Sequence, residues 1–594
     1  MKNLKYPFIL ILFLHATSCE DILDKQPLDT ISDNLVWNDR QLIESYVADL
    51  YFETDFMERR TVQQTGVSYA MIGSMGGEGR SFGGHHQPYR SATTPIQASG
   101  ANVSLDYWKY NNIRNANYAL EQLESRSSLD QAFIDQRSLE IRYLRAYMYF
   151  QMVIRYGGVP LITKVQGVET GEAGTAFVPR DSEQDIYDFI ISEMDVLSQQ
   201  LPSSYDDFDK GRPTKWAAYA LQSRAALYAA SIANYGEVQL GGLLGIPSGE
   251  VAKYAQISVD ASNAIIDNGI HSLYEEIENK IDNFHAIWMD ESSANKEKLM
   301  VEVFDFGLNK GHPFTPRAMP HDFSGSWGAY HYLYDWVERF EFADGTPGTS
   351  VTREELVRPE GWAMDELMSN RDPRFMASVF YPGAPWKGSN VYIHFGTWTG
   401  GQLGDGEFLN AGIDENGFPY KAHPRNIAKS GFMVKKRTDP NVSPSGGFPG
   451  LFNDDRDYIV FRLGEVYLNL AEANFYLNNT TVALAALNRV RERAGMPPKT
   501  EITEDILQNE RLVELSWENH SYWDLRRWRI AQEVLDGVRM AGVKWFYLYE
   551  TKKYAVELIK AEGVPRLFQA HNYYLPLGTA RVAENPNLAE NPGY

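Results

Sequence analysis

The sequence contains a single cysteine, Cys19, among 594 residues. One cysteine excludes disulfides within the chain, and it excludes zinc or iron–sulfur sites built from several cysteine ligands. Basic residues are also scarce, because 56 Lys and Arg stand against 78 Asp and Glu, a formal net charge of −22. A protein that neutralises phosphates needs the opposite balance, so nucleic acid is not an expected partner.

Long hydrophobic runs are missing as well, and no segment has the 18 or so apolar residues that a membrane-spanning helix needs. The apolar run at 8–14 is short; it follows Lys2 and Lys5 and precedes the small residues 16–18 and Cys19. This pattern predicts a lipoprotein signal peptide over 1–18 and a single domain over 19–594. We therefore expect Cys19 to carry the lipid that is the only membrane attachment. A buried cysteine in a core helix is the alternative, but two acidic residues follow it directly.

Apolar residues at spacings of three and four are frequent in two parts of the chain, about 39–268 and 456–530. The expected helices cover 39–51, 108–123, 139–154, 186–197, 216–228, 254–266, 463–477 and 482–493. Taken in order they form pairs, with small residues alternating with aromatic ones, which is typical of tetratricopeptide-like packing. The central stripes predict burial of Tyr147, Leu221, Leu227, Tyr467 and Leu470.

Between about 269 and 455 the helical pattern fades, and Gly, Pro, Trp and Tyr become dense. Alternating residues predict strands at 298–306 and 391–395, and one helix is expected near 354–368. An insertion at about 60–105 adds to the irregular part. The predicted fold class is mainly α: a tetratricopeptide-like helix-pair scaffold with a large face of irregular loops and short strands. Binding residues are often found on such loops when a rigid frame holds them.

Candidate catalytic and metal-binding patterns are weak. Residues 79–83 match G-x-S-x-G, but neither the apolar strand before the serine nor the helix after it is indicated. The 12 histidines include no H-x-x-x-H or H-x-H spacing. Carboxylates close enough for glycoside hydrolysis cannot be identified from the sequence, because only their separation in space is informative. We therefore predict no catalytic residues, no metal site and no cofactor, with a secreted glycan-acting hydrolase as the alternative.

Several segments together resemble the SusD/RagB family of surface glycan-binding lipoproteins. After Cys19 they cover nearly the whole chain in the family's order: 23–27, 142–147, 155–161, 211–215, 462–473, 510–518, 523–528, 574–576, 585–588 and 591–594. Most of these motifs are structural, since they supply Arg and Glu for caps and ion pairs. None of them identifies the ligand.

The resemblance implies a non-enzymatic binding protein that is lipid-anchored at the outer membrane of Bacteroidetes and faces outward. Family members capture oligosaccharides or polysaccharide fragments and pass them to a TonB-dependent SusC-like transporter, over which they form a lid. RagB-like relatives are associated with peptides, so a peptide-binding lipoprotein is a further alternative.

Glycan capture needs flat apolar rings beside hydrogen-bonding groups. The mid-chain loop 324–330 carries Trp327 and Tyr330 among Ser, Gly and Ala, which are too small to enclose them. The family takes ligand contacts from this region and from the N-terminal insertion, so both are expected to contribute. The predicted ligand-binding residues are Trp327, Tyr330, Tyr89, Arg80, His86 and Arg90, with Trp386 and Trp398 as further candidates. Packing of Trp327, Tyr89 or Arg80 against the scaffold is the alternative.

Overall fold

The computed structural model describes residues 33–57, 71–81, 95–97, 105–166, 177–308, 310–323, 328–427, 430–442 and 453–594. The predicted signal peptide and several predicted site residues lie outside the described residues. These are Cys19, His86, Tyr89, Arg90 and Trp327.

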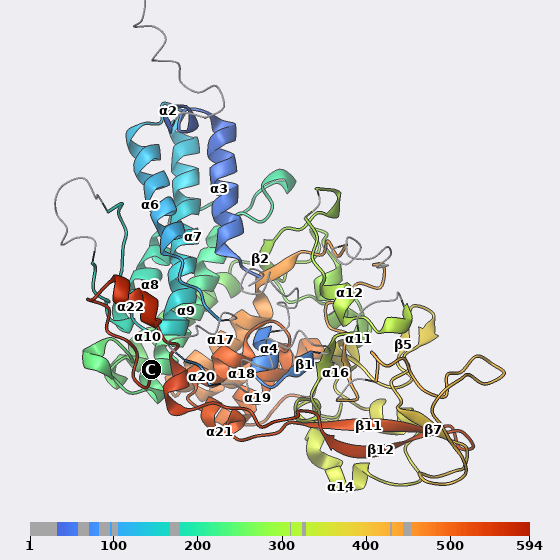
Figure 1. The fold of residues 1–594 in the computed structure, drawn as a ribbon. Helices are drawn as coiled ribbons and strands as arrows, with labels where there is room; N and C mark the ends of the chain where they lie inside the picture. The colour runs from blue at the N-terminus through green and yellow to red at the C-terminus, as the bar shows by residue number, and fades with distance from the viewer. Residues whose placement is uncertain are drawn as a thin grey trace, which may run out of the picture.

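Eight long helices form the predicted pairs (Figure 1). They are α3 (Arg40–Thr54) with α6 (Tyr110–Ser125), α7 (Gln131–Tyr156) with α8 (Glu183–Gln200), α9 (Lys215–Tyr235) with α10 (Val251–Ile266), and α17 (Leu463–Tyr476) with α18 (Thr480–Ala494). The helices of each pair touch, and α6 also contacts α7, α8 contacts α9, and α10 contacts α17. The prediction of a helix-pair scaffold is confirmed. The contact between α10 and α17, which joins the third pair to the fourth across the long insertion, was not predicted.

Local caps explain where these helices begin and end. Asp39 accepts hydrogen bonds from the first backbone amides of α3, and Thr214 does the same for α9. Ser182 and Asp185 form a capping box at the start of α8. Gly495 ends α18 in a left-handed conformation, which glycine adopts without steric cost.

Burial agrees with four of the five predicted core residues. Tyr147, Leu221, Leu227 and Leu470 are buried. The prediction that Tyr467 is fully buried was wrong. Its side chain is only partly buried, at the edge of the packed helices. Partial burial raises the pKa of its hydroxyl, which lies near charged groups at the surface. A tyrosine can pack its ring while keeping its polar end near water.

The loop-rich region is connected to the helices by short elements. Strand β2 (Lys298–Glu302) confirms the first part of the strand predicted at 298–306, and it pairs antiparallel with β10 (Tyr458–Arg462), which leads into α17. The strand predicted at 391–395 is absent; its backbone is irregular, and the strand begins one residue later as β7 (Gly396–Trp398). Three further two-stranded pairs are β1 (Gly79–Ser81) with β3 (Tyr330–Tyr332), β4 (Val379–Phe380) with β9 (Met433–Val434), and β5 (Pro385–Trp386) with β6 (Ser389–Asn390).

The helix predicted near 354–368 is divided in two. Helix α14 (Arg353–Leu356) and helix α15 (Met364–Met368) are separated by a turn that contains Pro359 and Gly361. Proline disfavours a helical conformation at the residue before it, and Gly361 has a φ of +66°. The remaining α-helices are α2 (Asp33–Val36), α4 (Met71–Met75), α11 (Lys280–Met289), α12 (Phe314–Ala318), α13 (Tyr334–Val337), α16 (Pro373–Ser378), α19 (Glu504–Glu514), α20 (Ser521–Arg527), α21 (Ala531–Leu535) and α22 (Thr579–Glu584).

A four-stranded sheet near the C-terminus was not predicted. Strands β11 (Ala541–Leu548) and β12 (Lys553–Lys560) form the long hairpin at the bottom of Figure 1. Strand β7 pairs parallel with β11, and β8 (Phe408–Leu409) completes the order β12-β11-β7-β8. This sheet therefore fastens part of the loop-rich region to the C-terminal part of the chain.

A buried ion-pair network connects the loop-rich region with the helices. The Glu514 carboxylate on α19 accepts hydrogen bonds from Arg462 at 2.7 Å, from Arg374 at 3.2 Å and from Arg493. Glu297 accepts from Arg462 at 2.9 Å and from Arg493 at 2.7 Å. All five side chains are almost fully buried. The charges are therefore compensated by one another rather than by water.

No helix in the described part of the chain combines the length and the apolar composition that crossing a bilayer requires.

Candidate binding face and groove

A two-stranded ribbon joins the two segments from which ligand contacts were predicted. Strands β1 and β3 pair antiparallel, with Arg80 opposite His331 and Ser81 opposite Tyr330. Residues from the edge of the N-terminal insertion and from the mid-chain loop therefore lie side by side although they are about 250 positions apart.

Tyr330 and Arg80 themselves are buried in this ribbon. Tyr330 has no exposed surface; its ring lies 5.7 Å from that of Phe314 and 5.8 Å from that of Trp517. Arg80 is 7% exposed. Neighbouring rings therefore cover Tyr330, and Arg80 is almost enclosed. Ligand contact by either residue stays a prediction.

The further tryptophan candidates are also packed against protein. Trp386 in β5 is buried and lies edge-to-face with Phe380 at 5.0 Å between ring centroids. Trp398 in β7 is partly buried, and its ring lies 5.0 Å from that of Phe408. Neither residue lies in the β1–β3 ribbon.

A pair of stacked histidines lies beside the mid-chain loop. The rings of His321 and His423 are 3.5 Å apart and inclined by only 4°, and both side chains are partly exposed. Burial, the neighbouring His423 and Arg425 lower the pKa of His321, so its ring is neutral at pH 7. A neutral His321 ring can stack closely on a neighbouring ring without the repulsion that two imidazolium ions would have.

Asn426 holds this histidine pair in place. Its side-chain oxygen accepts a hydrogen bond from the backbone N–H of His321 at 2.7 Å, and its amide nitrogen donates to the Asp322 carboxylate at 2.6 Å. Burial raises the pKa of Asp322. The Nδ1 atom of His423 accepts from the backbone of Arg425 at 3.2 Å, which leaves Nε2 as the protonated nitrogen.

Gly328 places the mid-chain loop next to these residues. It follows Trp327 in the chain and has a φ of +50°, and a Cβ atom there would lie 3.3 Å from the Asn426 oxygen and 3.2 Å from Met433. Glycine is therefore favoured at this close approach. We call the surface formed by His321, Asp322, His423 and Arg425 the histidine face. It offers flat rings, a carboxylate and a guanidinium, the combination that hydroxyl-rich ring compounds require.

The histidine face was not predicted from the sequence. His321 and His423 are 102 positions apart, and neither belongs to a recognisable motif. Only the fold brings them together. Among the described residues no group of three His, Cys, Asp or Glu side chains is arranged to hold a metal ion.

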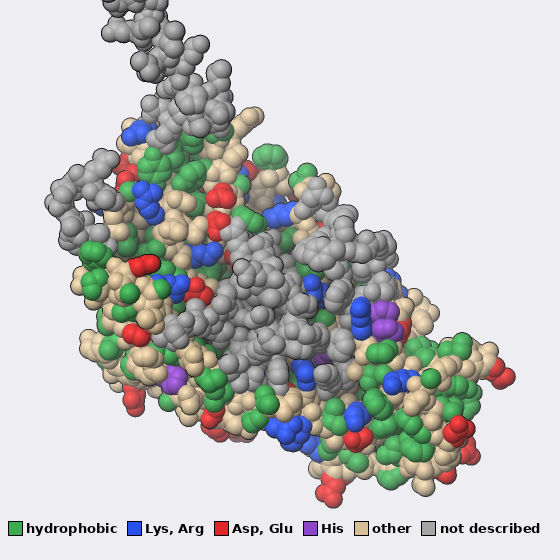
Figure 2. Space-filling view, viewed as in Figure 1, with side chains coloured by type: hydrophobic (Ala, Val, Ile, Leu, Met, Phe, Trp, Pro, Cys, Tyr) green, Lys and Arg blue, Asp and Glu red, His purple; other side chains and the backbone are tan. Residues whose placement is uncertain are grey.

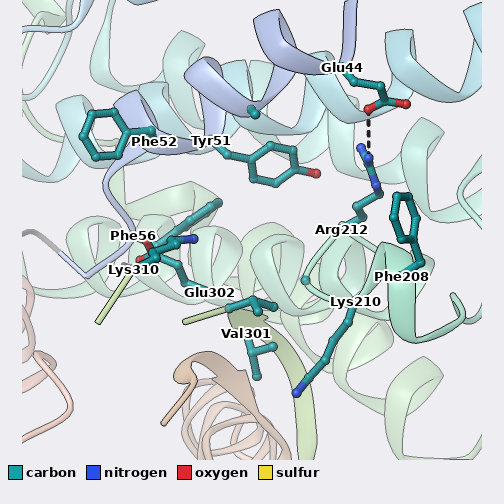
Figure 3. Close-up of a pocket in the computed structure, with 13 residues that line it drawn as sticks. Glu44, Tyr51, Phe52, Phe56, Phe208, Lys210, Arg212, Val301, Glu302 and Lys310 are labelled. Atoms are coloured by element: carbon teal, nitrogen blue, oxygen red, sulfur yellow. Dashed lines mark hydrogen bonds and ion pairs between the residues drawn. The ribbon is translucent and has the colours of Figure 1, made fainter. Parts of the chain in front are cut away.

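An apolar groove of about 400 Å³ lies between α3 and β2 (Figure 3). Tyr51 and Phe52 line it from α3, and Val301 lines it from β2. Phe208 at its edge is 93% exposed, and Phe52 is 44% exposed. We call this the phenylalanine groove. A concavity with exposed aromatic side chains at its edge is a candidate docking surface.

Arg212 closes one end of the phenylalanine groove. Its guanidinium bonds Glu44 at 2.9 Å, the bond drawn in Figure 3, and also Glu140 and Asp209, each at 2.6 Å. Because the Arg212 guanidinium is already bonded to these three carboxylates, its role is to stabilise the wall of the groove. On the side of the molecule shown in Figure 2, the Lys and Arg side chains are scattered among other types and form no continuous basic stripe over the described residues.

The fold is a helix-pair scaffold that carries a large loop-rich region with short strands. The model of the SusD family matches residues 286–594, and a second model, described as starch-binding associating with outer membrane, matches residues 23–227. The chain therefore belongs to the SusD family.

Individual relatives are distant in sequence and similar in fold. A SusD-like protein from Bacteroides ovatus is 24% identical over 545 residues, which cover 87% of this chain and 80% of that protein. The crystal structure of a SusD-like protein from Bacteroides fragilis has a TM-score of 0.69 at 25% identity and covers 96% of this chain and 100% of that one. A SusD-like carbohydrate-binding protein from the same species has a TM-score of 0.67 at 22% identity, over 93% and 100%.

Proposed function

We propose that this protein is a glycan-binding lipoprotein of the outer membrane. It captures oligosaccharides or polysaccharide fragments on the histidine face and passes them to a TonB-dependent SusC-like transporter. The observation that carries the proposal is the stacked pair His321 and His423 beside Asp322 at the mid-chain loop. Family membership supports it, and so does the carbohydrate-binding relative described above.

The histidine face suits binding better than catalysis. A retaining or inverting glycosidase needs two carboxyl groups on either side of the scissile bond. Asp322 is the one carboxylate that the described part of this face presents. Binding needs only flat surfaces for the C–H faces of a sugar and polar groups for its hydroxyls.

A glycan panel combined with a turnover assay tests this function. Purified protein should bind at least one neutral or acidic polysaccharide in affinity electrophoresis, and the same mixtures should show no increase in reducing ends over a day. Release of reducing ends would favour the secreted hydrolase instead. Binding to a peptide mixture with no binding to any glycan would favour a RagB-like peptide-binding protein.

The phenylalanine groove supports the transporter part of the proposal. It lies on the helical scaffold, and Phe52 and Phe208 expose more apolar area than a free surface usually keeps. Aromatic residues that project from a surface are typical anchors at protein–protein contacts.

The predicted lipid anchor at Cys19 can be tested separately from ligand binding. Cys19→Ala should fold as the wild type does but fractionate with soluble proteins, because the thiol that would carry the lipid is missing. Immunoblots of membrane and soluble fractions measure this. Ser18→Ala, which keeps Cys19 and a small residue before it, is the control and should remain in the membrane fraction. Retention of Cys19→Ala by the membrane in a strain without the transporter would contradict acylation at this residue.

A further inference from the structure

A second cavity lies near the C-terminus, away from the histidine face. Its volume is about 490 Å³, within the range of small-ligand sites. Its walls come from three parts of the chain: Tyr235 at the end of α9, Arg529 after α20, and the 3₁₀ turn Ala570–Tyr573 with the C-terminal residues that follow. We call it the C-terminal cavity.

Arg529 is the unusual residue in this cavity. Its φ is +59°, a left-handed conformation that favours glycine and strains other side chains. Its guanidinium lies 4.8 Å from the ring centre of Tyr573 and 4.9 Å from that of Tyr574. A strained backbone at a cavity wall is a reason to look for a function of the side chain.

The hydrogen bonds of Arg529 leave part of its donor capacity unused. Its Nη2 atom donates to the Tyr574 hydroxyl at 2.7 Å, and that hydroxyl donates to Glu183 at 2.7 Å. Arg529 forms no ion pair with a described carboxylate, and no described residue accepts a hydrogen bond from its Nε or Nη1 atoms. Guanidinium N–H groups in a fork are well placed to bond two oxygen atoms of one ligand.

The tyrosine rings are held rigidly. The Tyr573 hydroxyl donates to the Arg529 carbonyl at 2.8 Å and accepts from the backbone of Gln532 at 3.1 Å. Tyr235 and Tyr573 are partly exposed, so parts of their rings remain open to solvent. Rings fixed in advance lose little conformational freedom when a ligand packs on them.

The polar groups at the mouth of the cavity balance one another in charge. Glu237, which is exposed, also lines the cavity and adds a carboxylate to the cationic Arg529. Burial lowers the pKa of His571, so this imidazole is neutral at pH 7 and offers both a donor and an acceptor. An anionic ligand would gain from Arg529 but would be repelled by Glu237. A neutral ligand with many hydroxyl groups can use both.

We propose that the C-terminal cavity is a second carbohydrate site that takes one or two neutral sugar residues of a polysaccharide. This inference rests on the proposed glycan-binding function. The C-terminus and α12, which precedes His321, lie on opposite sides of the view in Figure 1. The two sites are therefore separate. A polysaccharide long enough to reach both would gain from linked binding, whereas a short oligosaccharide would occupy them independently.

Two variants test the cavity in different ways. Arg529→Gly removes the guanidinium and places glycine at a position whose φ suits it, which offsets the lost contacts and favours a folded protein. Ala570→Trp adds bulk at an exposed residue of the cavity wall and removes no existing contact. The probes are soluble starch, laminarin, xylan and galactomannan, followed by the matching oligosaccharide of whichever polymer binds.

The wild type should bind a neutral polymer in affinity electrophoresis and show two oligosaccharide sites per chain in calorimetric titration. Each variant should show one site, with the affinity of that remaining site unchanged and the apparent affinity for the polymer at least about tenfold weaker. One site in the wild type, or two sites in both variants, would overturn the second site and leave the proposed function standing. If the wild type binds no neutral polymer, the second site is overturned. If it binds acidic glycans only, the second site is still overturned, but the proposed function of the histidine face is supported.

Discussion

Replacing Glu514 by Gln is expected to lower the free energy of unfolding by about 3 to 5 kcal/mol. Burial alone would raise the pKa of Glu514, but the charges of Arg493, Arg462 and Arg374 outweigh this and hold it well below its ordinary value. The carboxylate is therefore ionised at neutral pH. The amide has the same shape but no charge, so three buried guanidinium groups would lose a shared counter-ion.

Chemical denaturation at pH 7, followed by tryptophan fluorescence, measures this loss. The matched control is Glu492→Gln on α18, whose side chain is 76% exposed and pairs with Arg489 at the surface. Exposed ion pairs contribute at most about 1 kcal/mol, so this control should unfold almost as the wild type does. Equal effects of the two substitutions would show that the buried network is not what stabilises the junction between α19 and the loop-rich region.

Replacing His423 by Ala should weaken binding of the cognate oligosaccharide at least about tenfold, or ~1.4 kcal/mol, while the melting temperature stays near that of the wild type. The side chain is partly exposed, and its ring stacks on His321 rather than on the hydrophobic core. Its removal takes away a flat surface and leaves His321 without support. The same result is expected for Trp327→Ala from the sequence-based prediction for that residue.

Calorimetric titration beside a thermal melt on one preparation separates affinity from stability. His423→Phe keeps a flat ring and should retain most of the affinity if stacking is the main contribution. His271→Ala is the control, because this partly buried histidine packs against Trp216 on the helical scaffold. An unchanged affinity in His423→Ala would move the ligand away from the histidine face, and a large drop in melting temperature would assign His423 a structural role.

The parts of the fold that depend on neighbouring residues were predictable. Helices α7, α9 and α17 could be placed from apolar residues three and four positions apart, because one turn of helix brings such residues to one face. Asp39 and Gly495 are likewise local signals of a helix start and end. Tyr467 was misassigned because a stripe does not show which of its members lies at the edge of the core.

The candidate sites depend on contacts between distant residues. The pairing of Arg80 with His331 and the stacking of His321 on His423 follow from the path of the chain, which spacing along the sequence does not encode. Exposure of Tyr330 was inferred from its small neighbours in the loop, but Phe314 and Trp517 from other segments cover it. The roles of Trp327, Tyr89, His86 and Arg90 stay predictions.

The contact between α10 and α17 has a consequence for how such a protein can diversify. Helix α10 precedes the loop-rich region in the chain, and α17 follows it. Because these two helices pack together, both ends of the loop-rich region are attached to the scaffold. A different loop-rich segment could replace this one if it supplied the charged side chains that pair with Arg462, Glu514 and Glu518. Glu297, Arg374 and Lys436 meet that requirement here by bonding to Arg462, Glu514 and Glu518. A chimera with other loops would have to keep these three residues and also the strands β2 and β7, which pair with β10 and β11.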